Sequence, residues 1–565
     1  MLIEEEKILE SRNCKKCNQN FEITEVDAEF YDKVSPEIWG NKYLLPFPTL
    51  CPDCRQQKRL SQRNEKSLYT RKCDQSWDSI ISIYSPDKPY TVFKADYWWS
   101  DEWDAVDYGI DYDFKLSFFE NYKALDIKVP KLATTIQNSE NCEYTNDTWD
   151  SKDCYMSYRT HYSQDIMHSY RANKSSDCVD CYQVKQSANL YECFQSNVCN
   201  NSQYLYNCEN THTSYFLHNC TGSANCFLSY NLTNANYTFF NKTYEKDVYL
   251  KKVAEVLADP VKFNKAKNVF FNLISREIPS PALQNSSSEN CSWNGLIESI
   301  DCKNCFMMKG CEWCRHGWDN VNYKYSMDTY SGGGSEYSYE TLATKNSFKN
   351  CFTHRVKESN NLIYCMFSFF SNNCFGCIGI KNKEYCILNK QYTKAEYDTL
   401  LPKIISAIQK SWEWGEFFPS NISQFGYNET VANEYFPLTK DEIVNQWFQY
   451  SSYEQAFPQV EKIIPASKLP LNISDIPDDI LSWAIECEVS KKPFRIIEKE
   501  LAFYRKRNIP IPRRHPDIRH ADRISYTSPR KLVENKCSIC DRDIISPYGA
   551  CSWKKILCTE CFQSV

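Results

Sequence analysis

Small or apolar residues recur at every third position between residues 138 and 233, and the pattern repeats every twelve residues. Counted from Asn138, the second, fifth, eighth and eleventh positions of each repeat are mostly Ser, Thr, Cys, Ala or a branched aliphatic residue. A period of three fits neither an α-helix, with about 3.6 residues per turn, nor a flat strand, with about two. The pattern predicts a narrow parallel β-solenoid with four short sides per turn and one inward side chain per side.

Two more columns of the repeat carry structural information. The fourth position is Asn or Asp in seven of the eight repeats, and these residues tolerate a left-handed backbone, which suits a corner. The ninth position is mostly aromatic from Tyr158 to Tyr230. This column predicts a stacked row of rings, which is either a structural ladder or a platform on which bases or sugars stack.

The repeat returns later in the chain. The segment that begins at Cys226 aligns without a gap with the segment that begins at Cys374, 148 residues further on. The three-residue periodicity precedes both segments. This duplication predicts a mainly β fold with two tandem solenoid blocks, at 138–233 and 288–388. A helical insert or cap at 234–287 is expected to separate them, with helices near 246–258 and 394–412 covering the open coil ends.

Outside the two blocks, composition divides the chain further. A short helix is expected at Asp478–Val489, because Asp478 and Asp479 stand near a capping position. The seven expected segments are 1–72, an N-terminal zinc ribbon; 73–137, an acidic connector rich in aromatic residues; 138–233, the first block; 234–287, the helical insert; 288–388, the second block; 389–531, a helical and extended region rich in Pro and aromatic residues with a basic segment; and 532–565, a C-terminal zinc ribbon.

Composition sets the cellular context. The chain has 565 residues, of which 30 are Cys, and a net charge of −6, which gives no global nucleic-acid signature. No apolar run of 18 residues predicts a membrane span, and no apolar stretch near Met1 predicts a signal peptide. A cytoplasmic protein with reduced thiols is therefore expected. The oligomeric state is left open.

Eight cysteines have the spacing of zinc ligands. Each terminal region has two CxxC pairs, with spacers of 33 and 17 residues, and four thiolates suit a closed, tetrahedral, structural Zn²⁺ site. Lone CxxC pairs also serve redox chemistry, but two pairs in a reduced chain favour zinc. The predicted ligands of two Zn²⁺ ions are Cys14, Cys17, Cys51, Cys54, Cys537, Cys540, Cys558 and Cys561.

Cysteines inside the repeat have two interpretations. Inward positions recur every third residue, so two cysteines at neighbouring inward positions have CxxC spacing whether or not they bind a metal. A free cysteine packs as a small apolar residue. Core packing is therefore the favoured interpretation, with metal or redox use as the alternative, best represented by the cluster from Cys302 to Cys314.

Two resemblances to known families rest on these residues. Residues 14–58 resemble a probable zinc-ribbon family of uncharacterised bacterial and archaeal proteins, through Cys14, Cys17, Phe21, Phe30-Tyr31, Pro48-Thr49 and Cys51-Pro52-Asp53-Cys54-Arg55. Residues 374–400 and 413–565 resemble cysteine-rich, zinc-ribbon-flanked proteins of candidate-phyla-radiation bacteria, through Trp414–Pro419, Ile464–Pro470 and Pro512–Pro516. The first resemblance implies zinc binding, and neither implies a defined activity.

A basic segment lies before the C-terminal ribbon. Residues 501–531 carry nine Lys or Arg against two Asp, and a basic stretch beside a zinc ribbon is a frequent nucleic-acid footprint. The alternative is an internally paired or solvated face. The candidate nucleic-acid contacts are Arg505, Lys506, Arg507, Arg513, Arg514, Arg519 and Arg523.

These features favour a non-catalytic, zinc-binding solenoid scaffold that engages a large partner, RNA or a ribonucleoprotein. The first alternative is a β-helix enzyme that acts on polysaccharide, by fold analogy alone. The second is a cysteine-based metal or redox protein. The sequence contains no nucleophile elbow, P-loop, dinucleotide fingerprint or HExxH motif, so no catalytic residue is predicted.

Overall fold

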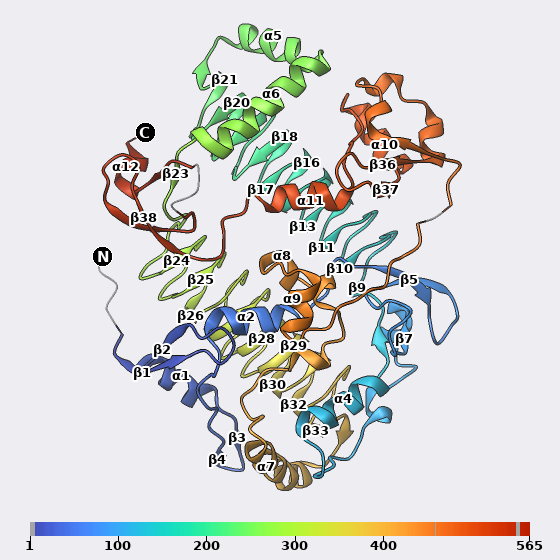
Figure 1. Ribbon diagram of the computed structural model, residues 1–565, viewed down its shortest axis with the longest axis vertical. Coiled ribbons are helices and arrows are strands. Elements are labelled where there is room, and N and C mark those ends of the chain that lie inside the picture. The colour runs from blue at the N-terminus through green and yellow to red at the C-terminus, as the bar shows by residue number, and fades with distance from the viewer. Residues whose placement is uncertain (1–5, 458, 550–553, 565) are drawn as a thin grey trace. The chain divides into compact units, whose positions relative to one another are not determined.

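A computed structural model describes residues 6–457, 459–549 and 554–564 (Figure 1). The chain forms two compact units, and each has segments from distant parts of the sequence. Unit 1 contains the described residues of Met1–Ala133, Leu283–Tyr453 and Arg530–Leu532. Unit 2 contains those of Thr134–Ala282, Glu454–Pro529 and Val533–Val565. Both are built mainly of β-structure, with many parallel strands.

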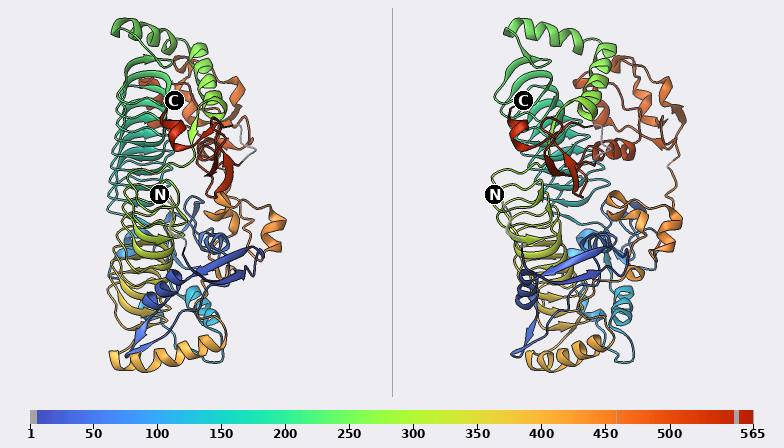
Figure 2. Two further views of the ribbon diagram at one scale, coloured as in Figure 1. Left: turned by 90° about the vertical axis from the view of Figure 1, so that its left-hand side faces the viewer. Right: turned by 60° about the vertical axis from the view of Figure 1, so that its left-hand side comes forward.

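Unit 2 contains a long sheet whose parallel strands stack one above another (Figure 2). Neighbouring strands pair residues that are twelve apart in sequence, as in the series Tyr158, Tyr170, Tyr182 and Phe194. The final pair, β21 with β22, is antiparallel. The strands are β9 (Ile136–Gln137), β10 (Asn146–Trp149), β11 (Tyr158–His161), β12 (Gln164–Met167), β13 (Tyr170–Asn173), β14 (Ser176–Val179), β15 (Tyr182–Lys185), β16 (Ala188–Tyr191), β17 (Phe194–Asn197), β18 (Asn200–Tyr206), β19 (Tyr215–His218), β20 (Ala224–Tyr230), β21 (Asn236–Phe239) and β22 (Lys242–Thr243).

Unit 1 contains a second sheet of the same kind, again with parallel partners twelve residues apart, such as Tyr339 and Cys351. A separate parallel pair, β24 (Trp293–Asn294) with β25 (Cys305–Phe306), has the same spacing. The strands of the sheet are β26 (Glu312–Arg315), β27 (Lys324–Tyr330), β28 (Tyr339–Lys345), β29 (Cys351–Lys357), β30 (Asn360–Ile363), β31 (Met366–Phe369), β32 (Asn372–Phe375), β33 (Cys386–Ile387) and β34 (Lys390–Gln391).

Hydrogen bonds explain why polar Ser residues point into so thin a core. The Ser163 hydroxyl donates to the His161 carbonyl, at 2.8 Å, and accepts from the Ser175 N–H twelve residues on, at 3.1 Å. Each inward serine of this column thus satisfies backbone groups that are buried away from water. At the corners, all eight residues of the fourth position have φ between 48° and 58°, as the Asn and Asp pattern predicts.

The aromatic column of unit 2 is an internal ladder. Tyr170, Tyr182, Phe194 and Tyr206 are each at most 2% exposed, and successive ring centroids lie 5.4–5.5 Å apart. Phe270 packs on the ring of Tyr206, with centroids 5.7 Å apart. These four rings are therefore closed to bases or sugars, which supports the structural interpretation for this part of the column.

Helices pack beside the parallel strands in both units. In unit 2, α5 lies beside β21, as the views of Figures 1 and 2 show, and in unit 1 α7 packs on β33. The helices of unit 1 are α1 (Glu25–Val34), α2 (Pro52–Leu60), α3 (Ala95–Trp99), α4 (Phe118–Lys128), α7 (Lys394–Lys410), α8 (Ala432–Tyr435) and α9 (Lys440–Asn445). Those of unit 2 are α5 (Lys246–Leu257), α6 (Pro260–Asn272), α10 (Glu498–Lys506), α11 (Pro516–Ile524) and α12 (Thr559–Gln563). Among the helices described, none is long and apolar enough to cross a membrane.

Short strands complete both units. The helix expected at Asp478–Val489 is wrong: after a single 3₁₀ turn at Asp478–Ser482 the chain enters β36, because Trp483–Glu486 pairs with strands on both sides. The short strands are β1 (Ile8–Asn13), β2 (Asn20–Thr24), β3 (Glu37–Ile38), β4 (Asn41–Lys42), β5 (Tyr69–Lys72), β6 (Ser79–Ser82), β7 (Val92–Phe93), β8 (Lys131–Leu132), β23 (Ser280–Pro281), β35 (Lys462–Pro465), β36 (Trp483–Glu486), β37 (Pro493–Phe494), β38 (Val533–Lys536), β39 (Asp543–Ser546) and β40 (Ile556–Leu557).

Candidate metal centres

The four predicted cysteines of the N-terminal region come together in unit 1. Cys14 and Cys17 lie in the tight turn between β1 and β2, while Cys51 caps α2 and Cys54 lies in its first turn. Their sulfurs all lie within 4.8 Å of one another. Three of them are buried and Cys17 is exposed. We call this group the N-terminal tetrad.

The C-terminal cysteines form the same arrangement in unit 2. Cys537 and Cys540 lie in the turn between β38 and β39, Cys558 caps α12, and Cys561 is in that helix. These four sulfurs also lie within 4.8 Å of one another. We call this group the C-terminal tetrad.

The spacing of the sulfurs fits a tetrahedral metal ion. Zn–S bonds of about 2.3 Å place sulfurs about 3.8 Å apart. The Cys17 and Cys51 sulfurs are 3.6 Å apart, and those of Cys540 and Cys558 are 3.8 Å apart. Four thiolates fill a tetrahedral shell, so a metal ion held by either tetrad would have no open position for substrate.

Hydrogen bonds favour the thiolate form of one cysteine in each tetrad. The Cys54 thiol donates to Cys51 and lowers the pKa of Cys51 to about 5, and the same bond raises the pKa of Cys54. In the C-terminal tetrad, the backbone N–H of Cys540 lowers the pKa of Cys537 to about 6. The N-terminus of α2 at Cys51 adds a dipole that stabilises negative charge.

Two more turns have the shape of these cysteine turns without a tetrad. They begin at Cys73, between β5 and β6 in unit 1, and at Cys487, between β36 and β37 in unit 2. In all four turns the fourth residue after the cysteine is left-handed, with φ of 58–60°, and donates its N–H to the cysteine carbonyl. Ser76 and Ser490 occupy the place of the second cysteine. Sequence reasoning missed both turns, because it counted only complete CxxC pairs.

Two of the four cysteine turns, those that begin at Cys14 and Cys487, have a nearby helix with two arginines that bind carboxylates of a parallel sheet. In unit 1, α2 carries Arg55 and Arg59, whose guanidinium groups bind Asp328 at 2.9 and 3.0 Å. Arg59 also pairs with Glu340, twelve residues beyond Asp328. The side chains of Arg59 and Asp328 are both 0% exposed, so water does not screen this pair.

Unit 2 repeats this arrangement with α11. Arg519 and Arg523 both bind Asp180, and Arg523 binds Glu192 at 3.1 Å. Asp180 and Glu192 precede Asp328 and Glu340 by 148 residues each, which is the offset of the internal duplication. The two helices share the sequence Pro-Asp-x-Arg-x-x-x-Arg. Together, this offset and this motif are the signals that could have revealed both networks.

The basic segment is largely engaged within unit 2. Arg519 and Arg523 are 4% and 1% exposed, so their guanidinium groups cannot reach a phosphate. This favours the internal alternative for these two residues, while Lys506 is exposed. The remaining contacts are Arg505 with Asp478, Arg507 with Asn189, Arg513 with the Leu469 carbonyl, and Arg514 with Asp522.

The cysteines inside the parallel sheets serve as core residues. Their thiols point at backbone carbonyls, as Cys178 does toward Ser176 at 3.2 Å. Among the residues that the structure describes, metal-ligating side chains gather closely enough to hold an ion in the two tetrads and nowhere else. The cluster from Cys302 to Cys314 is buried with Leu296 and Met308, which supports packing as its role.

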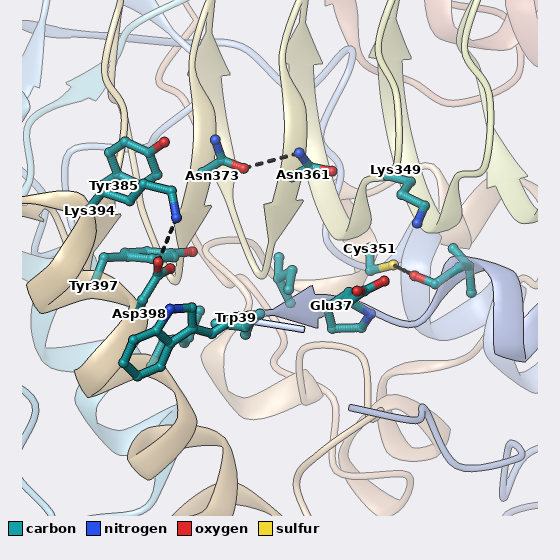
Figure 3. A pocket seen from close by; sticks show the side chains of 15 residues that line it. Glu37, Trp39, Lys349, Cys351, Asn361, Asn373, Tyr385, Lys394, Tyr397 and Asp398 are labelled. Atoms are coloured by element: carbon teal, nitrogen blue, oxygen red, sulfur yellow. Dashed lines mark hydrogen bonds and ion pairs between the residues drawn. The ribbon is translucent and has the colours of Figure 1, made fainter. Parts of the chain in front are cut away.

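A hollow of about 230 Å³ in unit 1 is a candidate for a small ligand (Figure 3). Trp39 borders it from the tip of the β3–β4 hairpin. The Asp398 carboxylate on α7 is held by Lys394 at 2.6 Å, and Glu37 lies on a different wall.

No family model matches the chain, and no curated protein matches it. One solved structure with a match is that of a presumed acetyltransferase from Desulfovibrio desulfuricans G20, at 8% identity and a TM-score of 0.09. The match spans 44% of this chain and 65% of that one, slightly less than two thirds of its length. At this TM-score the likeness carries no argument about fold or activity, so the two cysteine tetrads remain the strongest functional feature of the molecule.

Proposed function

We propose that this protein is a non-catalytic scaffold of two β-solenoid blocks, each joined to a structural zinc ribbon, and that it binds RNA. The observation that carries the proposal is the pair of closed tetrads. Cys14, Cys17, Cys51 and Cys54 would hold one Zn²⁺, and the C-terminal tetrad would hold the other. A closed Zn²⁺ supplies folding energy and leaves no position for substrate.

The parallel sheets support the solenoid interpretation. Strand partners lie twelve residues apart in both units, and every third side chain of the repeat lies in the core. A coil of this kind presents a long, rigid surface to an extended partner. The inner thiols are used in packing, which favours a scaffold over a redox or metal-storage protein.

Exposed tryptophans in unit 1 support a binding role. Trp39, Trp77 and Trp447 are 74%, 73% and 86% exposed. Flat aromatic rings open to solvent are suited to stacking on unpaired bases.

The proposal is tested by purifying the native protein at low salt and recording the ratio of absorbance at 260 and 280 nm. We expect bound nucleic acid that ribonuclease removes and that high salt displaces, because phosphate contacts weaken steeply with salt. Deoxyribonuclease is the control and should leave the ratio unchanged. A ratio typical of protein alone at low salt would contradict the RNA assignment.

A further inference from the structure

A groove in unit 1 lies directly beside the N-terminal tetrad. Its volume is about 770 Å³, and Cys54 of the tetrad forms part of its wall. The residues that line it are Lys15, Lys16, Leu50, Cys54, Lys58, Pro419, Ser420, Asn421, Asn445, Gln446, Trp447 and Phe448. Three lysines and three side-chain amides thus surround an exposed tryptophan, and these described lining residues include no carboxylate.

Trp447 is held at the edge of this groove by the end of α9. The backbone N–H of Trp447 donates to the Val444 carbonyl at 3.0 Å, and the backbone N–H of Phe448 donates to the Ile443 carbonyl at 3.0 Å. This closing pattern usually places glycine or asparagine at the left-handed position, which Trp447 occupies with φ of 61°. Phe448 is buried, so the backbone is anchored while the indole ring is 86% exposed.

The lysines are positioned by the cysteine turn and by α2. The Lys16 ammonium donates to the Gln57 side chain at 2.7 Å and lies 4.4 Å from the centre of the Phe448 ring. Lys58 is 3.3 Å from Glu416, so part of its charge is already balanced. Lys15, beside Lys16 in the turn, is exposed and adds a second positive charge.

We propose that this groove binds single-stranded RNA, with one base stacked on Trp447 and the adjoining phosphates beside Lys15 and Lys16. The amides of Asn445 and Gln446 can donate and accept hydrogen bonds at the base edge. The ammonium groups of Lys15 and Lys16 can donate hydrogen bonds to phosphate oxygens, which a neutral glycan lacks even though it would also stack on an indole. This inference rests on the proposed RNA binding and names the site and the stacking residue.

The test is fluorescence anisotropy with a labelled twelve-nucleotide oligouridine at fixed salt. Trp447→Ala is expected to weaken binding about ten-fold or more, because stacking on one ring accounts for a large share of single-strand affinity. Trp447→Phe, which keeps an aromatic face, should recover most of the affinity. Lys15→Ala should lower the slope of log affinity against log salt by about one unit.

Trp412→Ala is the matched control, since Trp412 is equally exposed, also follows a helix and is outside the groove. It should bind RNA as the wild type does, and every variant should keep its zinc content. If Trp447→Ala binds as tightly as the wild type, the groove assignment is wrong while RNA binding stands. If the wild type binds no oligouridine, both proposals are wrong. Competition by a neutral glucan oligomer would identify a glycan site and overturn the RNA assignment.

Discussion

Replacing Cys54 by serine is expected to release one zinc ion and to disorder the cysteine turn between β1 and β2 together with the first turn of α2. The apolar cluster around the tetrad is small, with Phe21 and Ile23 buried beside the cysteines, whereas Phe30, Tyr31 and Val34 of α1 pack in the larger core of unit 1. Binding of a structural Zn²⁺ supplies about 10–16 kcal/mol, so the cluster around the tetrad has little other source of stability. The α2 helix begins at the metal ligands and should lose its ordered start.

Release of this zinc ion should also destabilise the parallel sheet of unit 1. Arg55 and Arg59 reach Asp328 only while α2 is formed, so β27 and β28 should also exchange their amide hydrogens faster. Hydrogen exchange read by mass spectrometry measures both effects. Cys558→Ser is the control, because it removes the other zinc ion and should leave α2 protected. Unchanged protection of α2 after zinc is lost would show that the metal does not hold this helix.

Replacing Asp328 by alanine is expected to destabilise unit 1 by about 3–5 kcal/mol, because it leaves two buried guanidinium groups without their main partner. Arg55 and Arg59 are 5% and 0% exposed, so water cannot replace the carboxylate. Asp180→Ala should cost unit 2 a similar amount through Arg519 and Arg523. Thermal unfolding followed by circular dichroism measures the loss.

An exposed ion pair provides the comparison for this substitution. Glu312 lies 3.2 Å from Lys324, and both side chains are well exposed, so Glu312→Ala should leave the melting temperature nearly unchanged. If Asp328→Ala has the same melting temperature as Glu312→Ala, the buried network does not hold α2 on the sheet.

The sequence predicted the parts of this fold that depend on local spacing. The two tetrads follow from CxxC pairs, and the parallel register follows from the twelve-residue repeat. The left-handed residues at the fourth position of the repeat follow from Asn and Asp, whereas Met156, Val198 and Leu228 are left-handed at other positions without such a signal. Each of these signals acts within a few residues or recurs at a fixed interval.

The rest depends on contacts between distant segments. Arg519 and Arg523 belong to a basic run and were predicted to contact nucleic acid, but their partner Asp180 is more than 300 residues away in sequence. The turn at Cys487 has Ser490 in place of a second cysteine, so a count of CxxC pairs does not find it. No sequence motif marks Trp447, because its exposure depends on the backbone conformation at the end of α9.

We propose that two closed zinc sites stabilise this scaffold. Native mass spectrometry of the purified chain, with the metal identified by elemental analysis, counts the ions that are bound. We expect two zinc ions per chain, one after Cys54→Ser, and two after Cys305→Ser in the core. A chain that binds no zinc, that binds well above two equivalents, or that loses zinc on Cys305→Ser would contradict this proposal.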